Sequence, residues 1–156
     1  NALAMLSNGK HFIAASNDGK VSVTAFGEKL PAALFEDHQG AVGSLAVSKD
    51  NQRCVSASDT GEIFLWRIDD FTIIQKFGDI DCHVNDVRFN IDETAIWVAC
   101  GDSHIRIYDV SSGRLRATLE GHTAEVNSLG FRKKQNFIVS GSSDNSVALW
   151  QMPAGH

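Results

Sequence analysis

The chain is 156 residues long, 43% hydrophobic and 21% charged, and its formal net charge is −5 at pH 7. This composition is typical of a globular domain with one ordinary core and excludes a disordered chain. Acidic and basic residues are interspersed, so we expect neither nucleic acid nor an anionic membrane as the main partner. No apolar run approaches the ~20 residues of a membrane span. Three cysteines without metal-ligand spacing indicate reduced thiols in an intracellular protein of the cytoplasm or nucleus.

The first 36 residues are predicted to form four short strands, because apolar and polar residues alternate in short runs between polar turns. The turns contain Asn8-Gly9 and Asp18-Gly19, dipeptides that tight hairpins favour. Pro31 precedes the fourth run, which suits an outer strand that need not donate every N–H. The predicted strands cover residues 1–6, 11–16, 21–26 and 32–35.

The same pattern returns three more times at an interval of 42 residues without a gap, and the shift aligns Trp150 with Tyr108 and Trp66. An interval of this size falls within the ~40–45 residue period of propeller blades. Because no stretch has the 3.6-residue apolar period of a helix, we predict an all-β chain. The remaining predicted strands are 42–47, 53–56, 62–66, 71–77, 84–89, 95–99, 104–109, 114–119, 125–131, 136–140 and 146–150.

The fourth repeat carries Gly121-His122, then Ser140-Gly-Ser-Ser-Asp144, then Leu149-Trp150. In these residues it resembles the WD-repeat (Trp-Asp) family of β-propellers, with Gln151 in place of the final aspartate. The resemblance implies four-stranded antiparallel blades, the last without its outer strand. It also implies the last four blades of a larger, seven-bladed ring, which further blades or a partner chain would complete; a closed four-bladed ring is the alternative. The implied blades are 1–36, 40–78, 82–120 and 124–156.

His122, Ser140 and Asp144 are the residue types of a nucleophilic triad, so a hydrolase is one reading of the fourth repeat. The chain has no Gly-x-Ser-x-Gly elbow to present the serine. The resemblance implies instead a buried structural relay, in which the aspartate contacts the histidine, the histidine contacts the serine, and the serine accepts the indole N–H of Trp150. We therefore expect a structural role for these residues.

The other repeats keep this relay unevenly. The second repeat has Thr60 at the aspartate position, and its three relay residues are His38, Ser56 and Trp66. The third repeat retains only Asp102, because the other positions hold Ile80, Val98 and Tyr108. We expect apolar packing and strand pairing to stabilise the third blade.

We expect three further features to have ordinary structural roles. Residues 79–83 with Cys100 and His104 lack the paired spacing of zinc ligands, so we expect no metal, and no cofactor motif is present. The basic run 132–134 is expected to be a solvated hairpin. Trp97, beside Val98 on a predicted strand, is expected to pack between blades rather than to form an exposed aromatic anchor.

These observations favour a non-enzymatic scaffold that recruits proteins or peptides within a multi-subunit complex. The resemblance implies that partners contact the face formed by the loops between blades and the loops between the second and third strands. Several residues there are acidic, which favours a basic peptide or loop. A structural subunit with no ligand-binding face is the main alternative. The expected contact residues are Asn17, Gln39, Ala41, Asp59, Asp81, His83, Gly101, Thr123, Glu125 and Ser143.

Overall fold

The computed structural model describes residues 2–78, 80–131 and 137–151, and the described residues form β-strands joined by turns. Each strand pairs antiparallel with the next strand of its sheet. The first sheet contains β1 (Leu3–Met5), β2 (His11–Ala15), β3 (Val21–Ala25) and β4 (Ala33–Phe35). The second contains β5 (Val42–Val47), β6 (Arg53–Ser58), β7 (Ile63–Arg67) and β8 (Ile73–Phe77).

The third sheet contains β9 (Val84–Phe89), β10 (Ala95–Cys100), β11 (Ile105–Asp109) and β12 (Leu115–Leu119). The fourth contains β13 (Val126–Phe131), β14 (Phe137–Ser142) and β15 (Val147–Gln151). The predicted all-β architecture of antiparallel four-stranded units is confirmed, with three strands in the described part of the last sheet. No helix that could cross a membrane occurs in the described ranges.

The 42-residue repeat is visible in the backbone as well as in the strand positions. Strands β5, β9 and β13 begin at residues 42, 84 and 126. The turn between the second and third strands of every sheet contains one residue with left-handed backbone, and a positive φ favours Gly or Asn. These residues are Gly19 (φ 82), Gly61 (φ 85), Ser103 (φ 72) and Asn145 (φ 64).

Several strand ends differ from the prediction for local reasons. β8 begins at Ile73 and not at 71, because Phe71 adopts a left-handed φ of 60 that closes the preceding turn. Its ring stacks on Trp66 with centroids 5.4 Å apart. β6 extends to Ser58 and not only to 56, because pairing with β5 continues past a bulge as far as Val42.

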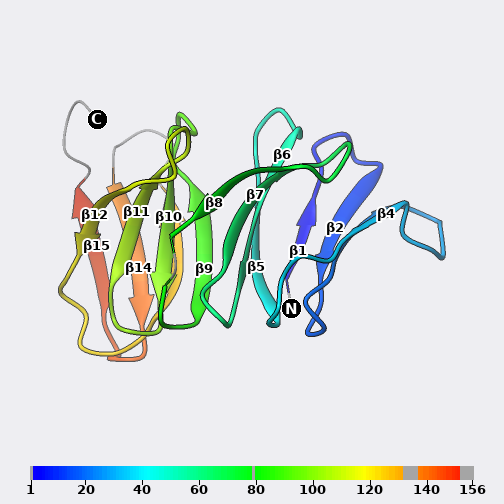
Figure 1. The fold of residues 1–156 in the computed structure, drawn as a ribbon. Helices are drawn as coiled ribbons and strands as arrows, with labels where there is room; N and C mark the ends of the chain where they lie inside the picture. Colours follow the sequence, from blue (N-terminus) through cyan, green and yellow to red (C-terminus); the bar gives the residue numbers. More distant parts are fainter. Residues whose placement is uncertain (1, 79, 132–136, 152–156) are drawn as a thin grey trace.

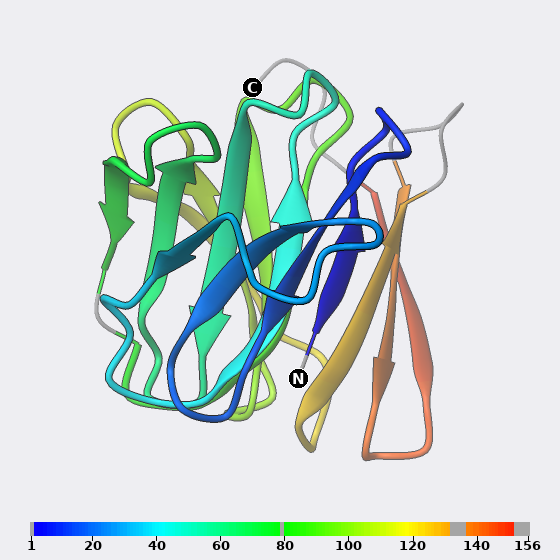
Figure 2. The same cartoon turned by 90° about the vertical axis from the view of Figure 1, so that its right-hand side faces the viewer.

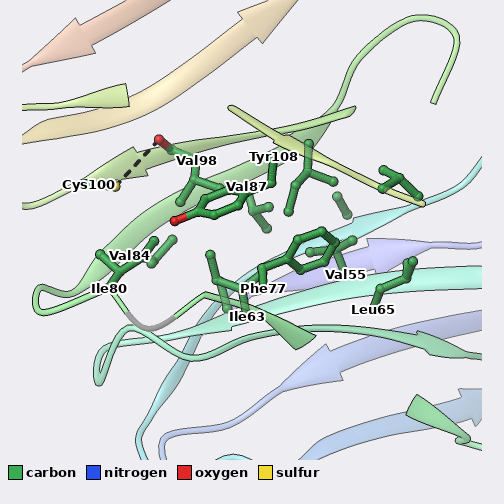
Figure 3. Packing of buried hydrophobic residues seen from close by; sticks show 14 residues of the cluster. Val55, Ile63, Leu65, Phe77, Ile80, Val84, Val87, Val98, Cys100 and Tyr108 are labelled. Carbon is green, nitrogen blue, oxygen red and sulfur yellow. Dashed lines mark hydrogen bonds between the residues drawn. The ribbon is translucent and has the colours of Figure 1, made fainter. Parts of the chain in front are cut away.

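The sheets pack face to face in chain order, with their first strands adjacent: β1 lies beside β5, β5 beside β9 and β9 beside β13 (Figures 1 and 2). Each interface is mainly apolar. Ile13 and Val21 of the first sheet pack with Trp66 of the second. Ile63 of the second sheet packs with Tyr108 of the third, within the cluster that Figure 3 shows. Burial between the sheets therefore supplies the core.

Trp97 lies between the third and fourth sheets, as predicted, and is 1% exposed. Its ring meets the edge of Phe131 with centroids 6.0 Å apart, and Ile138 belongs to the same cluster. The alternative of an exposed aromatic anchor is wrong for Trp97, because its indole is buried against the neighbouring sheet.

The two outermost sheet faces remain exposed in the described chain. Leu3 and Met5 of β1 are 67% and 59% exposed, and Val147 and Leu149 of β15 are 73% and 65% exposed. Strand alternation explains which residues point outward, since successive side chains project to opposite faces. The first and fourth sheets thus each bury one face and leave the other face apolar and accessible.

Candidate functional site

The fourth sheet contains a chain of hydrogen bonds that joins the loop before β13 to β14 and β15. Asp144 Oδ2 lies 2.8 Å from His122 Nδ1, and His122 Nε2 lies 2.7 Å from Ser140 Oγ. The indole N–H of Trp150 donates to Ser140 Oγ at 2.8 Å. We call these four residues relay four.

The two ends of relay four determine the direction of its hydrogen bonds. An indole N–H can only donate, and an ionised carboxylate can only accept. The Ser140 hydroxyl therefore accepts from Trp150 and donates to His122 Nε2, while the Nδ1–H of the imidazole donates to Asp144. The pKa of Asp144 lies well below its usual range, mainly because the Ser146 side chain donates a hydrogen bond to the carboxylate. Burial opposes this lowering, and hydrogen bonds from the Thr123 N–H and from His122 add to it. Each polar side chain of the relay thus has a hydrogen-bond partner.

A hydrolytic triad has the same sequence of Asp–His–Ser hydrogen bonds, so the solvent exposure of the serine and histidine decides between a structural and a catalytic role. Ser140 is 0% exposed and His122 is 7% exposed. The serine oxygen also accepts the Trp150 indole N–H, so both of its contacts are with buried or half-buried side chains of the same sheet. This geometry supports a buried polar strut rather than a nucleophile.

The second sheet contains a similar chain, relay two, whose acidic member the sequence pattern did not identify. His38 Nε2 lies 2.6 Å from Ser56 Oγ, which also accepts the Trp66 indole N–H at 3.1 Å. Glu62 Oε2 accepts the backbone N–H of Gln39 at 2.9 Å and lies 3.5 Å from His38 Nδ1. In relay four the corresponding bonds go to Asp144, so Glu62 takes its place from a position two residues further along.

The distance of 3.5 Å between Glu62 and His38 Nδ1 is short enough for an ion pair but too long for a well-formed hydrogen bond. His38 Nδ1 therefore has no hydrogen-bond partner among the described residues. Burial lowers the pKa of His38, and the nearby Glu62 carboxylate only partly opposes that effect. The imidazole is therefore held neutral near pH 7. Burial raises the pKa of Glu62, but hydrogen bonds from Gln39 and Thr60 outweigh it and give a net lowering.

The third sheet has apolar contacts where the second and fourth sheets have a relay. Ile80, Val98 and Tyr108 occupy the relay positions and belong to the cluster between the second and third sheets. Figure 3 shows these three side chains within that cluster. Asp102 instead receives two hydrogen bonds from the guanidinium of Arg106, at 3.0 and 2.5 Å, which lower its pKa to about 2. Packing substitutes for polar contacts in this sheet.

The loops named above as a contact surface lie at one end of the sheets, along the lower edge of Figure 1. In three sheets, a backbone hydrogen bond joins the two kinds of loop. We call this end the loop face. Asn17, Gln39, Asp59, Asp81, Thr123 and Ser143 are exposed on it, whereas Ala41, His83, Gly101 and Glu125 are half-buried. The joining bonds run from Asp59 N to Ala41 O, from Gly101 N to His83 O and from Ser143 N to Glu125 O.

The loop face is strongly acidic. Among its described residues Lys20 is the one lysine or arginine, and it is paired with Glu36 at 2.7 Å. His83 and Glu125 approach to 3.3 Å, which links the loops before β9 and β13. Asp59 is exposed in the turn after β6, and Asp81 is exposed in the loop before β9. Such a surface attracts cationic groups over a Debye length.

The residues that lie close enough to share a metal ion differ from the set considered in the sequence, residues 79–83 with Cys100 and His104. Cys82, Cys100 and Asp102 place ligand atoms within 4.8 Å of one another, whereas His83 faces Glu125. The Arg106 guanidinium already neutralises Asp102, so the cluster does not favour a further cation. Residue 79 and the basic run 132–134 lie outside the described residues.

Comparisons with known proteins agree with this architecture. A model described as "WD domain, G-beta repeat" matches residues 113–151. A second, described as "Anaphase-promoting complex subunit 4 WD40 domain", matches residues 45–124, half of the chain. The first match begins before β12 and ends with β15, so the sequence repeat is offset from the sheet.

Three relatives illustrate the range of similar proteins. Autophagy-related protein 16 of Arabidopsis thaliana is 25% identical over 76% of this chain and 24% of its own length. Cilia- and flagella-associated protein 52 of Mus musculus is 28% identical over 99% of the chain and 25% of its own length. THO complex subunit 6 homolog of Danio rerio is 24% identical over 91% of the chain and 50% of its own length. The chain thus spans a quarter to a half of the length of these relatives.

Proposed function

The chain belongs to the WD40 repeat family, and from that premise we propose that it is a non-enzymatic intracellular scaffold whose loop face binds a basic segment of another protein. The observation that carries the proposal is the charge of the loop face, where exposed carboxylates such as Asp59 and Asp81 meet no free lysine or arginine in the described loops. Rim charges of this kind mainly raise association rates and select partners by sign.

The relays make the loop face rigid, which favours binding. Relay four holds the loop before β13 through His122, and relay two holds the loop before β5 through His38. A surface that is already ordered loses little conformational entropy on association. One relative is named as a homolog of a THO complex subunit, and another as a protein associated with cilia and flagella, so we propose a multi-subunit setting for this chain as well.

Charge reversal tests the proposed binding face. Asp59→Lys with Asp81→Lys should weaken binding of lysine- and arginine-rich peptides on an array at least about tenfold and reduce the salt dependence. Asp69→Lys is the matched control, because Asp69 is exposed in the turn between β7 and β8 at the opposite end. Equal binding by the double variant and the wild type would contradict the proposal and favour a structural subunit.

We also propose that another sheet of the same kind covers the exposed face of the fourth sheet. The apolar residues on that face have buried counterparts 42 residues earlier in the chain. Val139, Val147 and Leu149 are 39%, 73% and 65% exposed, whereas Trp97, Ile105 and Ile107 are 1%, 0% and 6% exposed. Contiguous exposed apolar surface normally marks an interface.

A hydrogen-bond pattern between adjacent sheets supports the same proposal. Ser44 Oγ accepts the backbone N–H of Val87 at 3.0 Å, and the Asp86 carboxylate accepts that of Leu129 at 2.9 Å. Ser128 lies 42 residues after Asp86, is exposed on β13, and would bind the backbone of the covering sheet in the same way.

Cysteine labelling tests this coverage. In the intact protein, a cysteine introduced as Val147→Cys should resist maleimide labelling, and rapid labelling would contradict coverage of this face.

A further inference from the structure

Two of the three cysteines lie close together beside the loop face. Cys82 is half-buried in the loop before β9, and Cys100 is the last residue of β10. Their sulfur atoms lie within 4.8 Å of one another. The backbone holds the two segments together here, because Cys100 pairs with Val84 and the Gly101 N–H donates to His83 O at 3.0 Å. Cys54 is distant from this pair, within the core between the first and second sheets.

The position of the pair corresponds to a side-chain link in the fourth sheet. Ala124 and Ser142 are the counterparts of the two cysteines 42 residues on, and Ser142 Oγ donates to Ala124 O at 3.1 Å. The third sheet has neither that hydroxyl nor a histidine–serine contact, since Ile80 and Val98 occupy the relay positions. Cys100 Sγ instead makes a weak contact with Val98 O at 3.7 Å, the dashed line in Figure 3. The reduced third sheet thus lacks the polar link that the fourth sheet has at this point.

We propose that Cys82 and Cys100 form a reversible disulfide, which ties the loop before β9 to β10 at the position where the fourth sheet has the hydrogen bond from Ser142 to Ala124 O. A small-molecule disulfide such as oxidised glutathione is the oxidant. Reversible pairs of this kind are the form that disulfides usually take in reducing compartments.

The reaction is an ordinary thiol–disulfide exchange in two steps. The more accessible Cys82, as thiolate, attacks one sulfur of oxidised glutathione, forms a mixed disulfide and releases one glutathione thiolate, which takes up a proton. Cys100, losing its proton to water, then attacks Cys82 Sγ and releases the second glutathione. Two protein thiols are oxidised to one disulfide while one molecule of oxidised glutathione is reduced to two of glutathione.

The surroundings of Cys100 make the second step the slower one. Burial raises the pKa of Cys100 to about 12, and a hydrogen bond from Arg106 only partly opposes this effect. A disulfide requires the two sulfurs to approach to about 2.05 Å. Closure therefore requires the two sulfurs to come closer, by side-chain rotation or a shift of the loop that carries Cys82, and the mixed disulfide on Cys82 should be detectable before it.

Peptide mapping tests the proposal. The intact protein is equilibrated in glutathione buffers of increasing oxidised fraction, quenched with acid, alkylated in denaturant, and digested with trypsin for mass spectrometry. We expect a Cys82–Cys100 cross-linked peptide pair, with Cys54 fully alkylated throughout. Because the disulfide restricts the unfolded chain, the thermal midpoint should rise by several degrees on oxidation and fall again with dithiothreitol.

Single variants separate this disulfide from other oxidation. Cys82→Ser and Cys100→Ser should each abolish the cross-link and the thermal shift, whereas Cys54→Ser should retain both. Glutathione that remains on Cys82 at equilibrium would overturn the proposal. So would alkylation of both thiols in the most oxidising buffer, or a cross-link found only between two molecules.

Discussion

Replacement of His122 by alanine tests the structural role of relay four. The substitution removes the hydrogen bonds of 2.8 Å to Asp144 and 2.7 Å to Ser140, and a longer one of 3.2 Å to Ser146, from a residue that is 7% exposed. Ser140 keeps the Trp150 indole as a donor but loses the acceptor of its own hydroxyl hydrogen, at a site with 0% exposure.

The expected magnitude follows from these contacts. A buried hydroxyl left without a partner costs about 1–3 kcal/mol. The His122 and Trp150 rings meet edge to face with centroids 6.0 Å apart, and loss of such a contact costs about 0.5–1.5 kcal/mol. We therefore expect His122→Ala to lower the free energy of unfolding by about 2–4 kcal/mol.

Urea denaturation of the intact protein, with amide hydrogen exchange to localise the effect, measures this loss. Exchange should accelerate mainly in β13–β15. His83→Ala is the matched control, because His83 precedes β9 as His122 precedes β13, but its side chain is 41% exposed and makes only a surface ion pair with Glu125. That control should lose less than about 0.5 kcal/mol. Equal losses in the two variants, or a His122→Ala loss below about 0.5 kcal/mol, would refute the reasoning.

Three other substitutions test the β6–β7 turn and relay two. Gly61→Ala should lower the free energy of unfolding by at least about 2 kcal/mol, because Gly61 has a φ of 85 and its new Cβ would overlap Ile80 O; Asp59→Ala, nearby and exposed, should be nearly neutral in the same urea titration. Glu62→Ala should cost about 1–2 kcal/mol, since the Gln39 N–H loses its acceptor, and an unchanged denaturation midpoint would remove Glu62 from relay two. Burial depresses the pKa of His38 in the folded state, so the unfolded chain binds more protons as the pH falls below about 6.5, and stability should fall there; His38→Gln should flatten the profile between pH 7 and 5, and an unaltered slope would contradict this origin.

Much of the fold was predictable because the pattern of burial is simple. Short runs rich in apolar residues stand between polar turns, so a run such as 84–89 predicts β9 to the residue. Strand ends were less predictable. The left-handed φ of Phe71 delays the start of β8, and nothing in the local sequence indicates that conformation.

The features that sequence reasoning missed depend on contacts between segments. Glu62 lies two residues after the expected acidic position, and only its longer side chain lets it reach the Gln39 N–H. The Asp86 bond to the Leu129 N–H becomes visible only when β9 and β13 are known to be adjacent. Cys82 and Cys100 have no motif spacing, and the β9–β10 pairing brings them together.

Hydrogen exchange of the protein in complex with partners captured from native extract tests the central claim, that the loop face binds other proteins. The account predicts protection on binding in the loops of residues 36–41, 80–83, 121–125 and 143–146, reversed by added salt. Protection confined to the turns at the opposite end, or to the exposed faces of the first and fourth sheets, would contradict it.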